Sequence, residues 1–158
     1  MAEAIALHLL MERPPRGVKV RVFSAGTGAI DGDHASEENA EALKAVGVVD
    51  VDMRRHRSRA LTAELIVRST VVYVMASTHA TQARSIAGDA AVKKVQMLDP
   101  AGKDIPDPVG RGSVVYRQTA QKLMEAIRQR LAEVISAEPV SKEMLKQGPE
   151  EGQKGGTR

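Results

Sequence analysis

Val71-Val72-Tyr73-Val74-Met75 is a nearly continuous apolar run near the middle of the chain. Such a run predicts a strand that is buried on both faces, as strands are in parallel sheets. Ser77 or Thr78 follows at once as a possible first residue of a helix, and Gly88 is placed to end that helix. A buried strand that leads directly into a helix is typical of α/β proteins.

The segments on either side continue this alternation. Residues 92–98 predict a second, weaker strand, and residues 99–112 form a Pro-, Gly- and Asp-rich loop. Residues 18–23 alternate Val with Lys and Arg, which predicts a third strand with one wet face. Amphipathic patterns and end signals predict helices over residues 2–12, 36–46, a short segment after Thr62, and 113 to Pro139. The sequence therefore predicts an α/β layer fold with a mainly parallel sheet.

Length and composition limit the remaining possibilities. The 158 residues suit one compact domain, which we expect over residues 1–137, followed by a disordered tail over 138–158. The absence of Cys excludes disulfides, thiolate metal sites and a cysteine nucleophile within these residues. A net charge of +3 is too small to indicate nucleic-acid or membrane binding. No targeting signal or membrane span is visible, so we expect a cytoplasmic protein.

One expected element of the sheet has no match in the sequence. The first strand of a doubly wound fold is usually central, and the loop after it carries the ligand site. This chain begins with a helical pattern and offers only three good strands. We therefore expect the first central strand to be missing.

Three polar segments give only weak indications of a nucleotide, metal or nucleic-acid site. Gly26-Thr27-Gly28 lacks the third glycine of a dinucleotide-binding loop, because Asp31 stands in its place, so a tight turn is favoured. The acidic group from Asp31 to His34 lacks the spacing of a calcium loop, and no histidine pair has zinc-ligand spacing. The basic run over residues 54–59 has no aromatic residues for base stacking, which favours a solvated loop or a contact to an anion.

The segment Asp104-Ile105-Pro106-Asp107-Pro108 is more unusual. Its two prolines restrict the backbone on both sides of Asp107. Such a stiff loop can hold one carboxylate in place, as a general acid requires. From the residues alone, a plain Asp-Pro turn before a helix is the favoured interpretation.

Taken together, these segments resemble the low-molecular-weight protein phosphatase family, with its tyrosine- and arginine-phosphatase branches. The resemblance covers nearly everything from Met1 to about Ile135, in the family's order and approximate spacing. The matching pieces are Met1-Ala2-Glu3-Ala4, Ser24-Ala25-Gly26-Thr27, residues 35–43, His56-Arg57-Ser58-Arg59 with Leu61-Thr62, Val74-Met75 followed by His79, residues 104–108 and Val115-Tyr116-Arg117.

The resemblance implies a three-layer αβα fold with a doubly wound parallel sheet, as in phosphotyrosine protein phosphatase I. It implies phosphoryl transfer through a cysteinyl-phosphate, with no cofactor and no metal. The catalytic residue carried over is Asp107, which would protonate the leaving group and then help to activate water. Ser24 and a polar group near His79 would support the phosphate-binding loop, which makes Ser24 and His79 the implied substrate-binding residues. The implied partner is a phosphorylated protein or a small phosphate ester, and neither a nucleic acid nor a membrane.

The chain departs from the family at two places. In the family, Met-Ala-Glu follows a Cys-x5-Arg-Ser/Thr loop, so the first strand, the nucleophile and the phosphate-binding arginine would all precede Met1. We therefore expect a phosphatase that is recorded without its nucleophile, from a gene product with an earlier start, and inactive as given. Val109 replaces an aromatic residue that walls the pocket, which leaves phosphotyrosine, phosphoarginine and small phosphate esters open as substrates. The alternative is a non-catalytic interaction module derived from the family.

Overall fold

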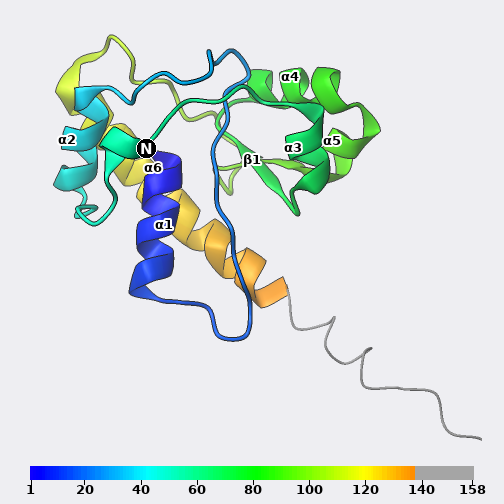
Figure 1. The fold of residues 1–158 in the computed structure, drawn as a ribbon, viewed down its shortest axis with the longest axis horizontal. Helices are drawn as coiled ribbons and strands as arrows, with labels where there is room; N and C mark the ends of the chain where they lie inside the picture. The colour runs from blue at the N-terminus through cyan, green and yellow to red at the C-terminus, as the bar shows by residue number, and fades with distance from the viewer. Residues whose placement is uncertain (138–158) are drawn as a thin grey trace, which may run out of the picture.

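The computed structural model describes residues 1–137 (Figure 1), so the predicted tail over 138–158 lies outside the described residues. The order of elements alternates helices and strands as the sequence predicts. The elements are α1 (Ala2–Glu12), α2 (Glu37–Ala45), the 3-10 turn η1 (Met53–Arg55), α3 (Ala63–Arg68), β1 (Val72–Val74), α4 (Ser77–Ala87), α5 (Asp89–Lys94), β2 (Val95–Met97) and α6 (Gly112–Ala137).

The sheet of the described residues consists of β1 and β2, which run parallel with Val72 opposite Val95 and Val74 opposite Met97. Parallel strands need a crossover connection, and α4 and α5 provide it. Beyond the ladder, the Leu98 amide donates to the Val74 carbonyl oxygen at 2.8 Å. The predicted α/β class with a parallel sheet is confirmed.

The apolar core lies in clusters on the two sides of this sheet. One cluster holds α1 against α6 and contains Ile5 and Leu123, with Tyr73 and Met75 packed against it. Another holds α3, α4 and α5 together around Ile66. In Figure 1, α1, α2 and α6 accordingly lie apart from α3, α4 and α5, with β1 between the two groups.

The predicted strand over residues 18–23 is wrong for this structure. The segment follows α1 without secondary structure, and its backbone makes no hydrogen bond with any described residue. The side chains still alternate in their exposure, because Val18, Val20 and Val22 are half-buried while Lys19 and Arg21 are exposed. A strand needs a ladder partner for its amides and carbonyls, and a period of two in the sequence does not supply one.

Two further expectations need correction. The predicted strand over residues 92–98 is a strand only at Val95–Met97, because α5 occupies the residues before it. Gly88, with φ of 53°, separates α4 from α5 and lets the chain start a second helix at once. In β1, Val72 and Tyr73 are half-buried and Val74 is buried, so the strand is not covered on both faces along its whole length.

Within the described part of the chain, none of the helices is both long enough and apolar enough to cross a membrane.

Candidate active site

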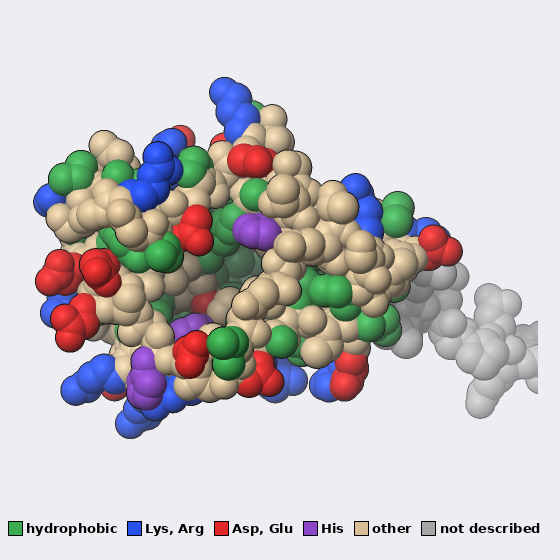
Figure 2. All heavy atoms as spheres, turned by 90° about the horizontal axis from the view of Figure 1, so that it is seen from above, with side chains coloured by type: hydrophobic (Ala, Val, Ile, Leu, Met, Phe, Trp, Pro, Cys, Tyr) green, Lys and Arg blue, Asp and Glu red, His purple; other side chains and the backbone are tan. Residues whose placement is uncertain are grey.

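The loop after β2 and the segment after β1 leave the sheet at the same end, because the two strands are parallel. Ligands of open α/β sheets bind outside the carboxyl ends of the strands. Figure 2 shows a hollow in one face of the molecule, with hydrophobic side chains in it and acidic and histidine side chains beside it.

Asp107 lies in the loop before α6 and is exposed. Its Oδ1 accepts a hydrogen bond from the Val109 amide at 3.0 Å, so the carboxylate is held by its own loop. Ile105 anchors the loop, because its side chain is buried and its amide donates to the Met75 carbonyl oxygen at 2.8 Å. The loop is therefore fixed to the end of β1.

Asp104 fixes the same loop to the first turn of α4. Its Oδ1 accepts from the Ser77 amide at 2.9 Å, and its Oδ2 accepts from Ser77 Oγ at 3.3 Å. His79 stands on that turn of α4 and is half-buried. The structure thus brings the Asp107 loop and the His79 turn together through Asp104, which the sequence analysis did not single out.

Ser24 is tied to the first turn of α1 instead. Glu3 Oε2 accepts from the Ser24 amide at 2.9 Å and from Ser24 Oγ at 2.5 Å. His56 Nδ1 lies 3.7 Å from the same Glu3 oxygen. Burial lowers the pKa of the Met1 α-amino group, and the nearby Glu3 carboxylate opposes that shift. The start of α1 is therefore half-buried, and Ser24 and His56 lie against its residue Glu3.

Glu3 and His56 are residues that sequence reasoning missed. Both stand in segments that carry the family resemblance, so a signal existed, but their pairing joins residues 53 positions apart and depends on the tertiary fold. Among the described residues, no hydrogen bond links the Ser24 group to Asp107 or His79. The three predicted site residues thus fall into two groups, with Ser24 bonded to α1 and with Asp107 and His79 near the end of β1.

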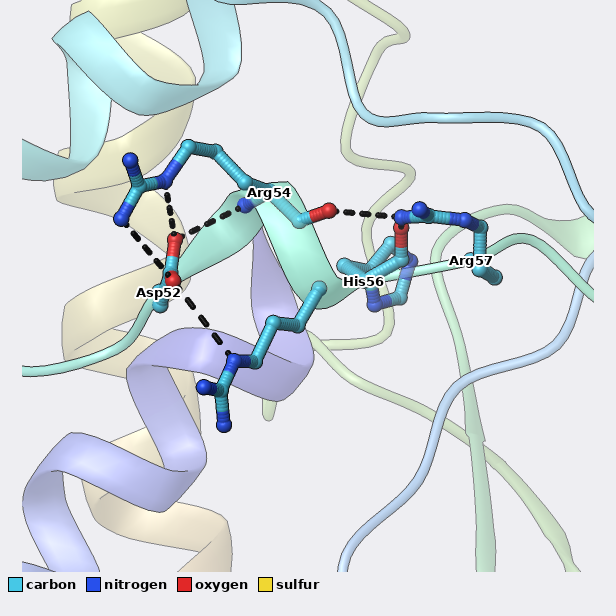
Figure 3. Close-up of polar contacts among 5 residues, drawn as sticks. Asp52, Arg54, His56 and Arg57 are labelled. Atoms are coloured by element: carbon cyan, nitrogen blue, oxygen red, sulfur yellow. Dashed lines mark hydrogen bonds and ion pairs between the residues drawn. The ribbon is translucent and has the colours of Figure 1, made fainter.

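The basic run beside this site is largely engaged within its own turn, as Figure 3 shows. Asp52 accepts from the Arg54 amide at 3.1 Å and from Arg54 Nε at 2.9 Å, and Arg55 Nε lies 3.8 Å away. The hydrogen bond from the Arg54 side chain is the main reason that the pKa of Asp52 is lowered. Arg57 Nη1 donates to the carbonyl oxygens of Arg54 and His56 at 2.6 and 2.8 Å. These bonds support the solvated-loop interpretation of the run.

The glycine turn and the acidic segment join two loops. Gly26 pairs with the segment beyond Arg59, because its amide donates to the Arg59 carbonyl oxygen and its carbonyl accepts from the Leu61 amide, both at 2.9 Å. A Cβ at Gly26 would lie 2.8 Å from the Ala29 Cβ, so the tight turn requires glycine. Asp31 Oδ1 accepts from the Ala60 amide at 2.6 Å. The carboxylate of Asp31 therefore has a structural partner in the protein itself.

Comparison with known proteins identifies the family. A statistical model of the family described as "Low molecular weight phosphotyrosine protein phosphatase" matches residues 1–143. No curated protein sequence matches the chain.

Solved structures of the same family are similar in fold and sequence. YwlE arginine phosphatase from Geobacillus stearothermophilus is 31% identical with a TM-score of 0.69, and the match covers 89% of each chain. A YwlE arginine phosphatase variant with a phosphorylated active-site serine is 29% identical with a TM-score of 0.75 over 88% of each chain. Vibrio vulnificus Wzb in complex with benzylphosphonate is 25% identical with a TM-score of 0.71, covering 84% of this chain and 87% of that chain. Since the family model extends over most of the sequence and the fold agrees, this chain belongs to the low molecular weight phosphotyrosine protein phosphatase family.

Proposed function

We propose that this chain provides the proton-donating part of a protein phosphatase, with Asp107 as the general acid and a cysteine outside these 158 residues as the nucleophile. The observation that carries the proposal is the fixed loop of Asp107, which is pinned to the end of β1 through Ile105 and to α4 through Asp104. A general acid must be held within hydrogen-bonding reach of the leaving group, and this loop is built to hold one carboxylate.

The reaction has two steps. The thiolate attacks phosphorus, the bond from phosphorus to the leaving oxygen breaks, and the Asp107 carboxyl gives its proton to that oxygen. The Asp107 carboxylate then takes a proton from water as the water attacks the cysteinyl-phosphate, and the sulfur–phosphorus bond breaks to release phosphate and the thiolate. The phosphorylated active-site serine in the similar YwlE variant supports a phosphoryl intermediate on the protein.

The first turn of α1 is the proposed location of the substrate phosphate. A helix N-terminus offers free amides and a favourable dipole to an anion. Ser24 and His56 lie around that turn through their contacts to Glu3, so they are placed to orient a loop that carries the phosphate. His79, on the first turn of α4, is proposed as a further polar group for the substrate phosphate.

Two unpaired backbone edges support a nucleophile that comes from a further polypeptide segment. Among the described residues β1 pairs only with β2, and residues 18–23 pair with nothing. An extended segment added beside these edges would give their amides and carbonyls partners. The 158 residues contain no Cys, so the thiolate has to come with such a segment, whether it is joined to this chain or belongs to another.

The substrate proposed is a phosphorylated protein or a small phosphate ester. Val109 follows the Asp107-Pro108 pair and is 70% exposed. An aliphatic side chain there cannot stack on a phenol ring as an aromatic residue can. This favours phosphoarginine or an alkyl phosphate over phosphotyrosine, in keeping with the similarity to arginine phosphatases.

The test compares the chain as written with the same chain preceded by an apolar strand and a Cys-x5-Arg-Ser loop. We expect no phosphate release from p-nitrophenyl phosphate by the chain alone and clear release by the extended protein. Replacing the added Cys by Ser should abolish the activity. Asp107→Asn should lower the hydrolysis of phenyl phosphate, a poor leaving group, by about 10²- to 10⁴-fold. Turnover by the 158 residues alone that is lost in Asp107→Asn would show that our assignment of the nucleophile is wrong.

The second candidate is a non-catalytic interaction module derived from the family. The absence of Cys and the small Val109 favour it. Circular dichroism and a melting curve of the chain as written test this candidate. Cooperative unfolding would support a self-sufficient module, whereas a disordered or aggregated product would remove it.

A further inference from the structure

We propose that Asp104 is a positioning residue that sets the place of Asp107 by capping α4 from the neighbouring loop. The inference rests on the proposed function, because it treats Asp107 as the general acid. Asp104 itself touches no reacting atom in this proposal and acts through the loop that it anchors.

The first observation is that α4 lacks a cap of its own. The residue at its N-cap is Ala76, which has no side-chain oxygen to accept from the first turn. The first amides of a helix have no partners within the helix. Asp104 lies in another loop, 27 positions after Ser77, and its Oδ1 accepts a hydrogen bond from the Ser77 amide at 2.9 Å. Its negative charge also suits the positive end of the helix dipole.

The second observation is that the chain between Asp104 and Asp107 has little freedom. The Ile105 side chain is 6% exposed, and the Ile105 amide is bonded to the Met75 carbonyl oxygen. Pro106 fixes its own φ and restricts Ile105, and Pro108 restricts Asp107 in the same way. The segment from Asp104 to Asp107 is therefore a stiff unit that is held at Asp104 and at Ile105.

The third observation is that the carboxylate of Asp107 is oriented by the same loop. Its bond from the Val109 amide closes a turn that begins only three residues after Asp104. The Val109 amide is consequently a reporter of the Asp107 position, because it loses its partner when the turn opens.

The first experiment measures amide hydrogen exchange in the 158-residue chain and its variants. Asp104→Ala should accelerate exchange of Ile105 and Val109 by about tenfold or more, since exchange tracks the free energy of local opening. Asp104→Asn keeps an oxygen that can accept from Ser77 and should remain close to wild type. Asp99→Ala is the matched control, because Asp99 Oδ1 accepts from the Ala101 amide in the same loop and does not touch α4. Unchanged exchange of Val109 in Asp104→Ala would overturn the proposal.

The second experiment uses the extended, cysteine-bearing protein and two leaving groups. Asp104→Ala should lower kcat/KM for phenyl phosphate by roughly 10- to 100-fold and leave p-nitrophenyl phosphate much less affected, because only the poor leaving group needs the proton. Asp104→Asn should restore most of the loss. Equal losses for both substrates would indicate a merely structural role and overturn the proposal. If the unsubstituted extended protein is inactive, the proposed function fails, and the exchange experiment still decides whether Asp104 positions the loop.

Discussion

At the scale of single residues, the core depends on a few side chains that are completely enclosed. Ile5 of α1 is 0% exposed and packs in the cluster between α1 and α6. Ile5→Ala should lower the free energy of unfolding by about 2–5 kcal/mol, because the truncation removes buried methyl groups and leaves a cavity. Val49, which is 75% exposed, provides the control, and Val49→Ala should change stability by less than about 0.5 kcal/mol. Urea unfolding measures both, and equal effects would contradict the packing described.

Tyr73 gives a prediction about pH. Burial raises the pKa of its phenol above the usual value of 10.0, while Arg130 opposes the shift and Glu133 adds to it. The Arg130 guanidinium lies 5.2 Å from the centre of the Tyr73 ring. A raised pKa means that the contribution of Tyr73 to stability is complete below pH 10.0 and is lost as the pH rises through the folded value.

We therefore expect Arg130→Gln to raise the pKa of Tyr73 further, because the variant removes a nearby positive charge. Absorbance titration of phenolate formation measures the shift, and Tyr73→Phe identifies which transition belongs to Tyr73. A lower pKa in the Arg130 variant would contradict the arrangement of these side chains.

At the scale of elements, two residues at N-cap positions differ in whether their side chains accept a hydrogen bond from the helix backbone. Thr62 Oγ1 accepts from the Leu65 amide at 3.2 Å at the start of α3. Ser36 stands at the same position before α2 but makes no such bond, and its Oγ accepts from the Asn39 side chain instead.

Thr62→Ala should therefore cost about 1 kcal/mol of stability, near the middle of the usual range for a lost cap. Ser36→Ala should cost clearly less, because no backbone amide of α2 loses a partner. Thermal unfolding of the two variants under the same conditions makes the comparison. A larger loss in Ser36→Ala would mean that α2 is capped in solution in a way that the structure does not show.

At this scale, the limits of most helices could be predicted from the sequence. α1, α2 and α4 begin and end close to their predicted limits, and α3 and α6 begin close to theirs, because local signals such as Thr62, Gly88 and Pro14 act on the adjacent backbone alone. The strands were less predictable. Residues 92–94 belong to α5, since Val92 and two lysines are equally compatible with the end of a short helix.

At the scale of the whole molecule, residues 18–23 allow the strand pairing of the sheet to be tested. The backbone amides of this segment have no partner among the described residues, whereas the amides of Leu98 and Ile105 are bonded to carbonyl oxygens at the end of β1. Amide exchange of the chain alone should be fast over residues 18–23 and slow at Leu98 and Ile105.

Adding the strand and Cys-x5-Arg-Ser loop should protect residues 18–23, because their alternating side chains already have the pattern of a strand with one wet face. Protection of this segment in the unextended chain would contradict the structure. A dependence of that protection on protein concentration would show that a second copy supplies the partner.

The candidate site was only partly visible in the sequence. Asp107 in its stiff loop and Ser24 could be selected as candidates, because two prolines and a short ordered motif are local features. The contacts of Ser24 to Glu3, of Glu3 to His56 and of Asp104 to Ser77 could not, because each joins segments that are distant along the chain.

The sequence by itself determined the α/β class, the main helices, the stiff acidic loop and the absence of a thiol, because these depend on composition and on neighbours along the chain. Only the tertiary structure decided which segments pair in the sheet and which carboxylates hold which elements. A hydrogen-bond ladder and a cap supplied by another loop depend on where distant backbone groups meet, and no local pattern specifies their meeting.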